Sequence, residues 1–393
     1  MNRREFLYTG TATAAALSAR SYGRVLGAND RVGLGVIGLG RRGTIVTGEG
    51  FLQDPRVQVV AVCDIYDAQT SKFVPRLLGN APPPHTFVAY QDLLARKDVD
   101  AVLISAPDHQ HVTIATAALA AGKDIYLEKP TLHHWDERTA LLDAAAKYQR
   151  VVQCGMQQRS GAHYMRAKQE IFGEQKLGKV VFARGVWHNF PWQTRHIINK
   201  PKPAGLHWVL FEGPAPRVPY ETIRYTSWRY FPDYGNGLLA DIMTHWVDVA
   251  QWMLDDPHPT NAVALGGIYQ LHDGRVNPDT VSAIVQYDTW NFNFESSVLS
   301  IRNSDPSVFF EGTEGTLDLT RNGYVFTPNK GEPVRVNSAE SLERAHTKNF
   351  LDAVIAGKKV NASLEAGIDA SIPVQMALRS YWSHEIISRK ELV

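Results

Sequence analysis

A glycine-rich turn near the amino end constrains the fold of this chain more than any other feature. The apolar run VGLGVIG leads directly into Gly38-Leu39-Gly40-Arg41-Arg42-Gly43, a GxGxxG sequence between a predicted strand and a predicted helix. The first glycine permits a sharp bend, the second lets the backbone approach a pyrophosphate, and the third lets the helix pack close to the strand. The start of the helix adds free N–H donors for phosphates. The turn therefore predicts a dinucleotide-binding domain.

An acidic residue follows at the spacing that a bound ribose requires. Asp64 comes directly after the next apolar run, VQVVAVC, 21 residues after Gly43. A carboxylate there can accept hydrogen bonds from the adenosine ribose hydroxyls. It favours NAD, because a carboxylate repels the 2′-phosphate of NADP. Arg41 and Arg42 lie close enough in the sequence to keep NADP as an alternative.

Short β-branched runs alternate with longer amphipathic stretches between residues 31 and 155, which is the pattern of βαβ units and a mostly parallel sheet. We predict strands at VGLGVIG, VQVVAVC, DAVLIS, KDIYLE and RVVQCG, with helices that include 113–121 and 136–148. The runs are apolar throughout, which indicates burial on both faces of the sheet. The pattern predicts a doubly wound Rossmann domain at 31–155.

The pattern changes after about Arg159, where strands follow one another without intervening helices. The runs are KVVFARGVWHN, NAVALGGIYQL, TVSAIVQYDTWNFNFESSVLSI, SVFFEGTEGTLDLTR and GYVFTPN. They predict a large, open and mostly antiparallel sheet with helices on one face, hence an α+β substrate domain at 156–393 and an α/β fold class overall. The stretch from about 338 to 389 is helical in pattern and could pack on either domain.

The first residues, MNRREFL followed by a stretch of small residues, resemble a twin-arginine export signal. We expect this signal at 1–28 and a periplasmic or secreted protein. The stretch is too short and too weakly apolar to predict a stable membrane span, which needs about 18 or more apolar residues. Lys and Arg number 41 against 40 Asp and Glu, so no net field would attract a nucleic acid. Cys63 and Cys154 end apolar runs and cannot build a disulfide framework or a cysteine metal site.

Polar residues follow two of the predicted parallel strands. Lys129 lies in Glu128-Lys129-Pro130 at the end of KDIYLE, and Pro107, His109 and His111 follow DAVLIS. Open α/β sheets bind ligands at the carboxyl ends of their strands. A lysine in a turn is often only a solvated surface charge. Several polar groups at one edge instead predict a functional site.

Asp241 and His245 stand at i and i+4 in a predicted helix after Gly235-Asn236-Gly237, so they share one face. A carboxylate at that spacing can orient an imidazole, which can accept a proton near neutral pH. An ion pair on a helix surface would have the same spacing. Two metal ligands would fit as well, but no third ligand accompanies them, so we predict no metal site.

Aromatic residues are frequent before this helix. Most are expected in the core, but a minority could present flat faces to sugar rings beside groups that bond hydroxyls. The aromatic residues are Trp187, Trp192, Trp208, Trp228, Tyr230 and Tyr234. We expect a carbohydrate or polyol to contact His109, Gln157, Arg159, His188, Asn189, Trp228 and Arg229.

These motifs together resemble the Gfo/Idh/MocA oxidoreductases, named for glucose-fructose oxidoreductase, inositol dehydrogenase and a rhizopine-catabolism protein. The resemblance is carried by GLGRRG at 38–43, CD at 63–64, EKP at 128–130 and DxxxH at 241–245. FEGPAP at 211–216 and WR at 228–229 are similar to motifs of secreted branches of the family. Thr131-Leu132-His133 after EKP departs from the usual sequence, which affects the expected local pocket.

The resemblance implies that Lys129, Asp241 and His245 are the catalytic set of an NAD(P)-dependent oxidoreductase. We expect His245 to take the substrate hydroxyl proton, Asp241 to hold the imidazole and Lys129 to hydrogen-bond the developing alkoxide. It also implies a homo-oligomer, dimer or tetramer, formed through the open sheet. Two other functions stay open: a glycoside hydrolase or lyase with retained NAD, and a non-catalytic sugar-binding protein. The expected cofactor site comprises Gly38, Leu39, Gly40, Arg41, Arg42, Gly43, Asp64, Pro107, His111, Glu128 and Lys129.

Overall fold

The computed structural model describes residues 31–79, 82–188, 197–299 and 306–392. A parallel six-stranded sheet forms the first domain, in the order β3-β2-β1-β4-β5-β6. This is the strand order of a Rossmann domain, which places the ligand site between β1 and β4, where the order reverses. The strands are β1 (Val32–Ile37), β2 (Val57–Cys63), β3 (His85–Phe87), β4 (Ala101–Ile104), β5 (Asp124–Leu127) and β6 (Val152–Cys154).

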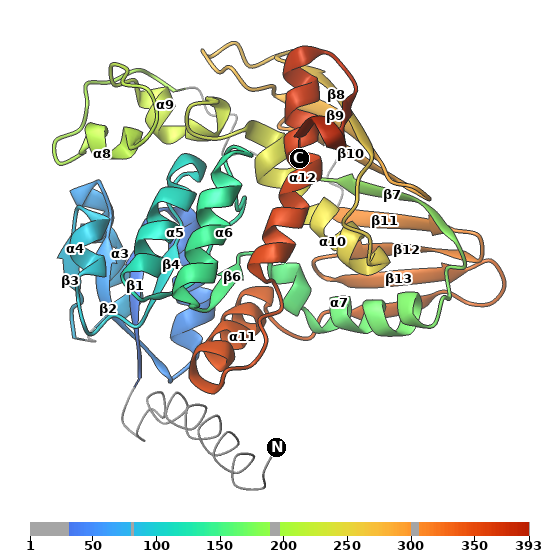
Figure 1. Ribbon diagram of the computed structural model, residues 1–393, viewed down its shortest axis with the longest axis horizontal. Coiled ribbons are helices and arrows are strands. Elements are labelled where there is room, and N and C mark those ends of the chain that lie inside the picture. The colour runs from blue at the N-terminus through green and yellow to red at the C-terminus, as the bar shows by residue number, and fades with distance from the viewer. Residues whose placement is uncertain (1–30, 80–81, 189–196, 300–305, 393) are drawn as a thin grey trace, which may run out of the picture.

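All five strands predicted for this domain are present, and every residue of β1, β4 and β5 is buried. Only β3 was missed, because it is short and mostly exposed at the sheet edge. Helices cover both faces, and the two helical stretches predicted at 113–121 and 136–148 correspond to α5 and α6 (Figure 1). The helices are α2 (Arg41–Ile45), α3 (Asp67–Leu78), α4 (Tyr90–Leu94), α5 (His111–Ala120) and α6 (Glu137–Tyr148).

A nine-stranded sheet forms the second domain, in the order β14-β13-β12-β11-β7-β10-β9-β8-β15. The β7–β10 pair is parallel and the other pairs are antiparallel, so the expected open, mostly antiparallel sheet is confirmed. The strands are β7 (Val180–Val186), β8 (Asn261–Gly267), β9 (Thr280–Gln286), β10 (Asn291–Ser297), β11 (Ser307–Gly312), β12 (Gly315–Thr320), β13 (Gly323–Pro328), β14 (Val334–Asn337) and β15 (Ile387–Ser388).

Helices pack against one face of this sheet. Side chains of β9 alternate between buried and exposed, as expected when only one face meets a core. α7 (Ala162–Ala167) and α10 (Thr244–Leu254) lie on the covered face (Figure 1). Gly185 allows α10 to approach β7, because a Cβ there would lie 2.6 Å from the Cβ of Trp246.

The two closing helices join the domains. α11 (Leu342–Ala356) contributes Phe350 and Leu351 to the core of the first domain. α12 (Leu364–Ser383) begins against that domain with Ile368 and continues into the core of the second with Met376. The helical pattern predicted from 338 to 389 thus packs on both domains.

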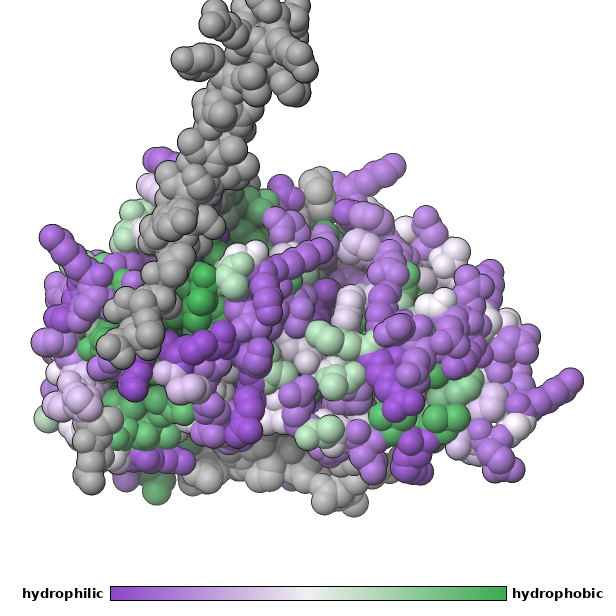
Figure 2. Space-filling model, turned by 90° about the horizontal axis from the view of Figure 1, so that it is seen from below, coloured by the Kyte–Doolittle hydropathy of each residue, from purple (hydrophilic) through white to green (hydrophobic). Residues whose placement is uncertain are grey.

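No helix in the described parts of the chain is long and apolar enough to cross a membrane. Seen from below, the molecule presents mostly hydrophilic residues, and the hydrophobic ones form separate small patches (Figure 2). The export signal predicted at 1–28 lies outside the described residues.

Candidate active site

The glycine turn between β1 and α2 has the shape that a pyrophosphate requires. Gly38 has a φ of +88° and donates its N–H to Cys63 O at 2.9 Å. A Cβ at Gly43 would lie 2.1 Å from Gly38 O, so only glycine allows α2 to sit this close to the strand. A Cβ at Gly40 would have no atom within 4 Å, so the backbone is open to a ligand there. The turn fits a dinucleotide.

Asp64 lies beside this turn at the carboxyl end of β2. Its Oδ2 accepts a hydrogen bond from Leu39 N at 2.8 Å, and its Oδ1 accepts one from Tyr66 N at 2.9 Å. Burial raises the pKa of Asp64 to about 6, although both backbone hydrogen bonds act in the opposite direction. Each carboxylate oxygen keeps a further lone pair for a ribose hydroxyl.

Arg42, expected at the cofactor, is bound instead by two carboxylates. Its Nε donates to Glu128 Oε1 and its Nη1 to Glu343 Oε1, both at 2.8 Å. The guanidinium thus fixes the start of α11 against the strand end that carries Glu128. Its Nη2 has no hydrogen-bond partner among the described residues, so the role of Arg42 at the cofactor stays a prediction. Arg41 is exposed next to it.

The central contact of the site joins the two domains. Lys129 follows β5 and donates its Nζ to Asp241 Oδ1 at 2.6 Å and to Asp241 O at 2.7 Å. Asp241 lies in a π-helical turn, Leu239–Met243, that leads into α10. Arg229 Nε lies 3.1 Å from the other carboxylate oxygen. Burial alone would raise the pKa of Asp241, but Arg229 and Lys129 outweigh it and hold the pKa well below its ordinary value.

His245 lies one turn after Asp241, but the expected hydrogen bond between them is absent. Asp241 binds the two cations, and the Nδ1 of His245 is buried without a hydrogen-bond partner among the described residues. The imidazole lies beside Trp187, with ring centroids 5.9 Å apart. Burial and then Lys129 lower the pKa of His245 well below its ordinary value. The imidazole is therefore neutral at neutral pH.

Two histidines after β4 hold backbone segments together. His111 places its Nδ1 2.7 Å from Pro130 O and its Nε2 2.9 Å from Ala106 O, so it joins the turn after β4 to the turn that carries Lys129. His109 places its Nε2 2.8 Å from Phe211 O in the second domain. Both rings are buried. His109 thus contacts backbone where a substrate contact was expected. It lies in a short 3₁₀ turn, Asp108–Gln110, which follows Pro107 and precedes His111.

Other residues predicted to contact the substrate form hydrogen bonds within the protein. Gln157 is buried and donates to Glu128 Oε1 at 3.2 Å. Arg159 donates its Nε to Asp248 Oδ1 at 2.9 Å. The Nδ1 of His188 accepts from Ser297 N at 3.1 Å. Asn189 and Trp192 lie outside the described residues.

Trp228 and Arg229, both predicted to contact the substrate, lie next to the contact between Lys129 and Asp241. The Arg229 guanidinium carbon lies 4.2 Å from the Trp228 ring centroid, in a cation–π contact. Arg229 also reaches Asp241, as described above. The Trp228 ring therefore packs against the same guanidinium that contacts Asp241.

The sequence reasoning missed two groups near this site. Asp108 is only 5% exposed, and burial raises its pKa to about 7 against the effect of Arg229 and Lys129. It stands between Pro107 and His109, so the same edge-of-sheet argument could have found it. Arg321 lies after β12, with its guanidinium carbon 6.0 Å from the Trp187 ring centroid. No local sequence signal points to Arg321.

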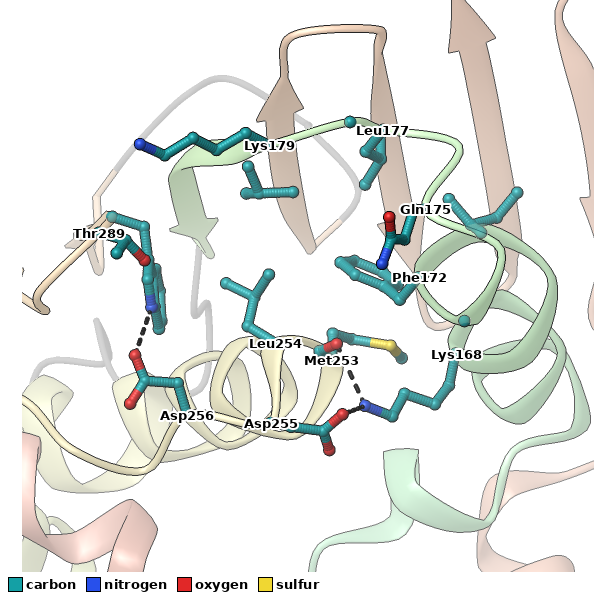
Figure 3. A pocket seen from close by; sticks show the side chains of 15 residues that line it. Lys168, Phe172, Gln175, Leu177, Lys179, Met253, Leu254, Asp255, Asp256 and Thr289 are labelled. Atoms are coloured by element: carbon teal, nitrogen blue, oxygen red, sulfur yellow. Dashed lines mark hydrogen bonds and ion pairs between the residues drawn. The ribbon is translucent and has the colours of Figure 1, made fainter.

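A cavity of about 400 Å³ lies elsewhere, in the second domain (Figure 3). Phe172, Leu177 and Leu254 line it, and Lys168 at its rim is paired with Asp255. None of the groups described above lines this cavity. Within the described ranges, no group of three or more His, Cys, Asp or Glu residues could hold a metal ion.

Two family models match this chain. Residues 32–156 match the oxidoreductase family with an NAD-binding Rossmann fold, and residues 165–318 match the GFO/IDH/MocA C-terminal domain. The matches follow one another and together cover well over half of the chain. The protein therefore belongs to the Gfo/Idh/MocA family of oxidoreductases, as its motifs predicted.

Curated relatives include glycosyl hydrolase family 109 proteins of Shewanella baltica and of Shewanella sp. W3-18-1, each 29% identical over 192 residues. The match spans 46% of this chain and 40% of the length of these relatives. It thus covers less than half of either protein.

Solved structures share the fold over nearly the whole chain. The WlbA dehydrogenase from Bordetella pertussis, in complex with NADH and UDP-GlcNAcA, is 16% identical with a TM-score of 0.69, covering 91% of this chain and 98% of that one. The aldose-aldose oxidoreductase from Caulobacter crescentus, complexed with glycerol, is 16% identical with a TM-score of 0.72, covering 91% and 99%. At these identities the likeness establishes the fold alone.

Proposed function

We propose that this oxidoreductase transfers a hydride between a hydroxyl-bearing carbon of a sugar or polyol and a nicotinamide cofactor. The observation that carries the proposal is the contact between Lys129 and Asp241, which places an ammonium at the carboxyl end of β5, near the dinucleotide turn. When bound, the nicotinamide would supply the hydride acceptor. The side chains of the protein then have to position the substrate oxygen and handle its proton.

Lys129 is held so that it can bind the substrate oxygen. Two of the three ammonium N–H donors go to Asp241, which leaves the third for a substrate hydroxyl. As the hydroxyl loses its proton, the fixed positive charge stabilises the developing alkoxide. Asp241 acts by keeping the ammonium in place, and Arg229 shares the carboxylate and keeps it ionised.

His245 is the proposed proton acceptor. Its ring is neutral, so the imidazole nitrogen that carries no proton can accept a hydrogen bond from the hydroxyl. The charged form is disfavoured by burial and by Lys129, so the proton has to be passed on from the ring. Asp108, with a pKa of about 7, lies near Lys129 and Arg229 and provides a second group that can carry a proton at neutral pH.

A second candidate is redox-assisted cleavage of a glycoside, favoured by the likeness to glycosyl hydrolase family 109 proteins. In this reaction a hydroxyl is oxidised only temporarily. The ketone acidifies a neighbouring C–H, and loss of that proton expels the aglycone, which takes up a proton, and leaves an unsaturated ketone. Water then adds across the double bond at the carbon that carried the aglycone, and the ketone is reduced again. The same residues would serve, with no net production of NADH. A third candidate is a sugar-binding protein that keeps the cofactor without turnover.

One preparation separates the three candidates. The cofactor is released from the purified protein and identified by mass spectrometry, and the protein is then tested with free sugars and with aryl glycosides. NADH formed from free sugars supports the dehydrogenase. Aglycone released without NADH supports the redox-assisted cleavage. Bound sugar with neither product supports the binding protein.

Cofactor preference, location and assembly are also proposed. NAD is favoured over NADP because the Asp64 carboxylate beside the glycine turn would repel a 2′-phosphate, while Arg42 is bound by Glu128 and Glu343. Export would use the twin-arginine segment at 1–28. A homo-oligomer would form through the open sheet face, where Val181, Leu265 and Ile284 are exposed. Sedimentation of the purified protein tests the assembly.

A further inference from the structure

A strap formed by residues 199–226 leaves the second domain and lies over the first (Figure 1). It carries α8 (Trp208–Glu212) and α9 (Thr222–Thr226). Its two ends are joined, because Thr222 N donates to Asn199 Oδ1 at 2.9 Å and Lys200 N donates to Thr222 Oγ1 at 2.8 Å. The strap is therefore a long loop whose two ends are held together by hydrogen bonds.

The strap pairs with the backbone that follows Asp64. His207 N donates to Ile65 O at 2.9 Å, and Asp67 N donates to Gly205 O at 3.1 Å. These bonds flank an antiparallel bridge between Tyr66 and Leu206. The strap thus contacts the segment immediately after the carboxylate that fits the adenosine ribose.

A second set of contacts fixes the strap to the loop after β4. Gln110 Nε2 donates to Leu210 O at 2.9 Å and to Phe211 O at 3.0 Å. His109 reaches Phe211 O as well. Since the loops after β2 and β4 lie on either side of the turn after β1, the strap bridges the edge of the sheet where a dinucleotide would lie.

Tyr225 of α9 brings the strap close to Asp64 itself. Its ring centroid lies 6.1 Å from that of Tyr66 and 5.5 Å from that of Phe211, both in edge-to-face geometry. Burial, and then the Asp64 carboxylate, raise the pKa of the Tyr225 hydroxyl. The hydroxyl is thus within electrostatic reach of the proposed ribose-binding group.

We propose that the strap is the outer wall of the adenosine-ribose subsite, with Tyr225 facing the ribose, and that the dinucleotide leaves only when the strap separates from residues 65–67. This inference rests on the proposed function, because it requires a bound dinucleotide. Release requires breaking both backbone bonds, the Gln110 bonds and the aromatic contacts together. The cofactor consequently exchanges slowly, and its oxidised form has to be restored within the site.

A reversible crosslink tests the proposal. Tyr66 and Leu206 form a non-hydrogen-bonded antiparallel pair, whose Cα atoms are about 4.5 Å apart in regular geometry, within the range of a disulfide. In the double variant Tyr66→Cys/Leu206→Cys, replacement of bound NAD by isotope-labelled NAD is followed by mass spectrometry. We expect exchange to be at least roughly tenfold slower when the disulfide is formed than after its reduction. Equal rates in the two states would overturn the proposal.

The wild-type protein under both redox conditions is the control, since its own cysteines, Cys63 and Cys154, are buried and unpaired. A second variant, Gln110→Ala, weakens the attachment of the strap without adding thiols. We expect it to exchange NAD roughly several-fold faster than the wild-type protein. Val209→Ala, on the exposed side of α8, should leave the rate unchanged. If Gln110→Ala exchanges NAD at the wild-type rate, the proposed role of the strap is contradicted, but the proposed function is not. A protein that neither carries nor binds NAD contradicts the proposed function as well.

Discussion

The Nζ of Lys129 lies 2.6 Å from Oδ1 of Asp241, although 112 positions separate the two residues in the chain. Lys129 follows strand β5 of the Rossmann domain, and Asp241 lies in a π-helical turn of the second domain. The site therefore exists only when both domains are folded and packed together. Its charged groups hold one another in place before a substrate arrives, as electrostatic preorganisation requires.

Loss of the Lys129 ammonium should slow turnover strongly without releasing the cofactor. For Lys129→Ala we expect kcat to fall by a factor of about 10² to 10³, the usual effect of removing one group that stabilises a developing oxyanion. NAD affinity should change little, because the turn at 38–43 and Asp64 are untouched. Steady-state kinetics and NAD titration check this, with exposed Lys147→Ala as the control. Parallel losses of activity and NAD affinity would argue against the assignment.

Removal of the Asp241 charge should destabilise the fold. Asp241→Asn leaves Lys129 and Arg229 without the carboxylate that both contact. Breaking a buried ion pair on one side typically costs about 3–5 kcal/mol in the free energy of unfolding. Urea denaturation should show this loss. Asp255→Asn, which breaks an exposed pair with Lys168, should show little change. Similar unfolding curves for the two variants would contradict the account.

The elements with strong local patterns were predictable from the sequence. Buried strands such as β1 and β4 are apolar throughout, and the glycine turn and the Lys129 turn have fixed local spacing. The short exposed strand β3 lacked such a pattern. β14 and β15 were also missed, because β14 has four residues that are mostly exposed and β15 has two.

The partners of the site residues depend on the tertiary fold, and several were missed. The sequence predicted that Asp241 would orient His245, but Lys129 and Arg229 take both carboxylate oxygens. Glu343 was missed because it reaches Arg42 across 301 positions. The i, i+4 spacing within a helix does not show which side chains from distant parts of the chain bind the same carboxylate.

Arg42 should matter for stability more than for cofactor preference. Arg42→Met leaves Glu128 and Glu343 as buried carboxylates without their shared cation. We expect the free energy of unfolding to fall by about 3–5 kcal/mol, while the ratio of NAD to NADP affinity stays nearly constant. Arg41→Met, at an exposed position, should leave stability almost unchanged. A large shift towards NAD in Arg42→Met with normal stability would restore the role predicted from sequence.

Buried histidines should make the fold acid-sensitive. Burial lowers the pKa of His111 and of His346 to about 4, whereas an unfolded histidine has a pKa of about 6.5. Above pH ~6.5 both states are neutral, so the full stability is present. As the pH falls from there towards 4, only the unfolded chain gains protons, and stability is lost, by up to about 3 kcal/mol for each residue. Urea unfolding at several pH values measures the slope, which should be shallower in His346→Gln. Identical slopes would exclude His346 as a contributor.

The position of the nicotinamide ring is the most direct test of the account. A crystal structure of the protein with NAD and a sugar or polyol should place the pyrophosphate at residues 38–43 and the ring next to Lys129. A substrate hydroxyl should lie within hydrogen-bonding distance, about 3 Å, of Lys129 Nζ and of the His245 ring. A ring bound away from Lys129, or a substrate that contacts neither residue, would contradict the proposed chemistry.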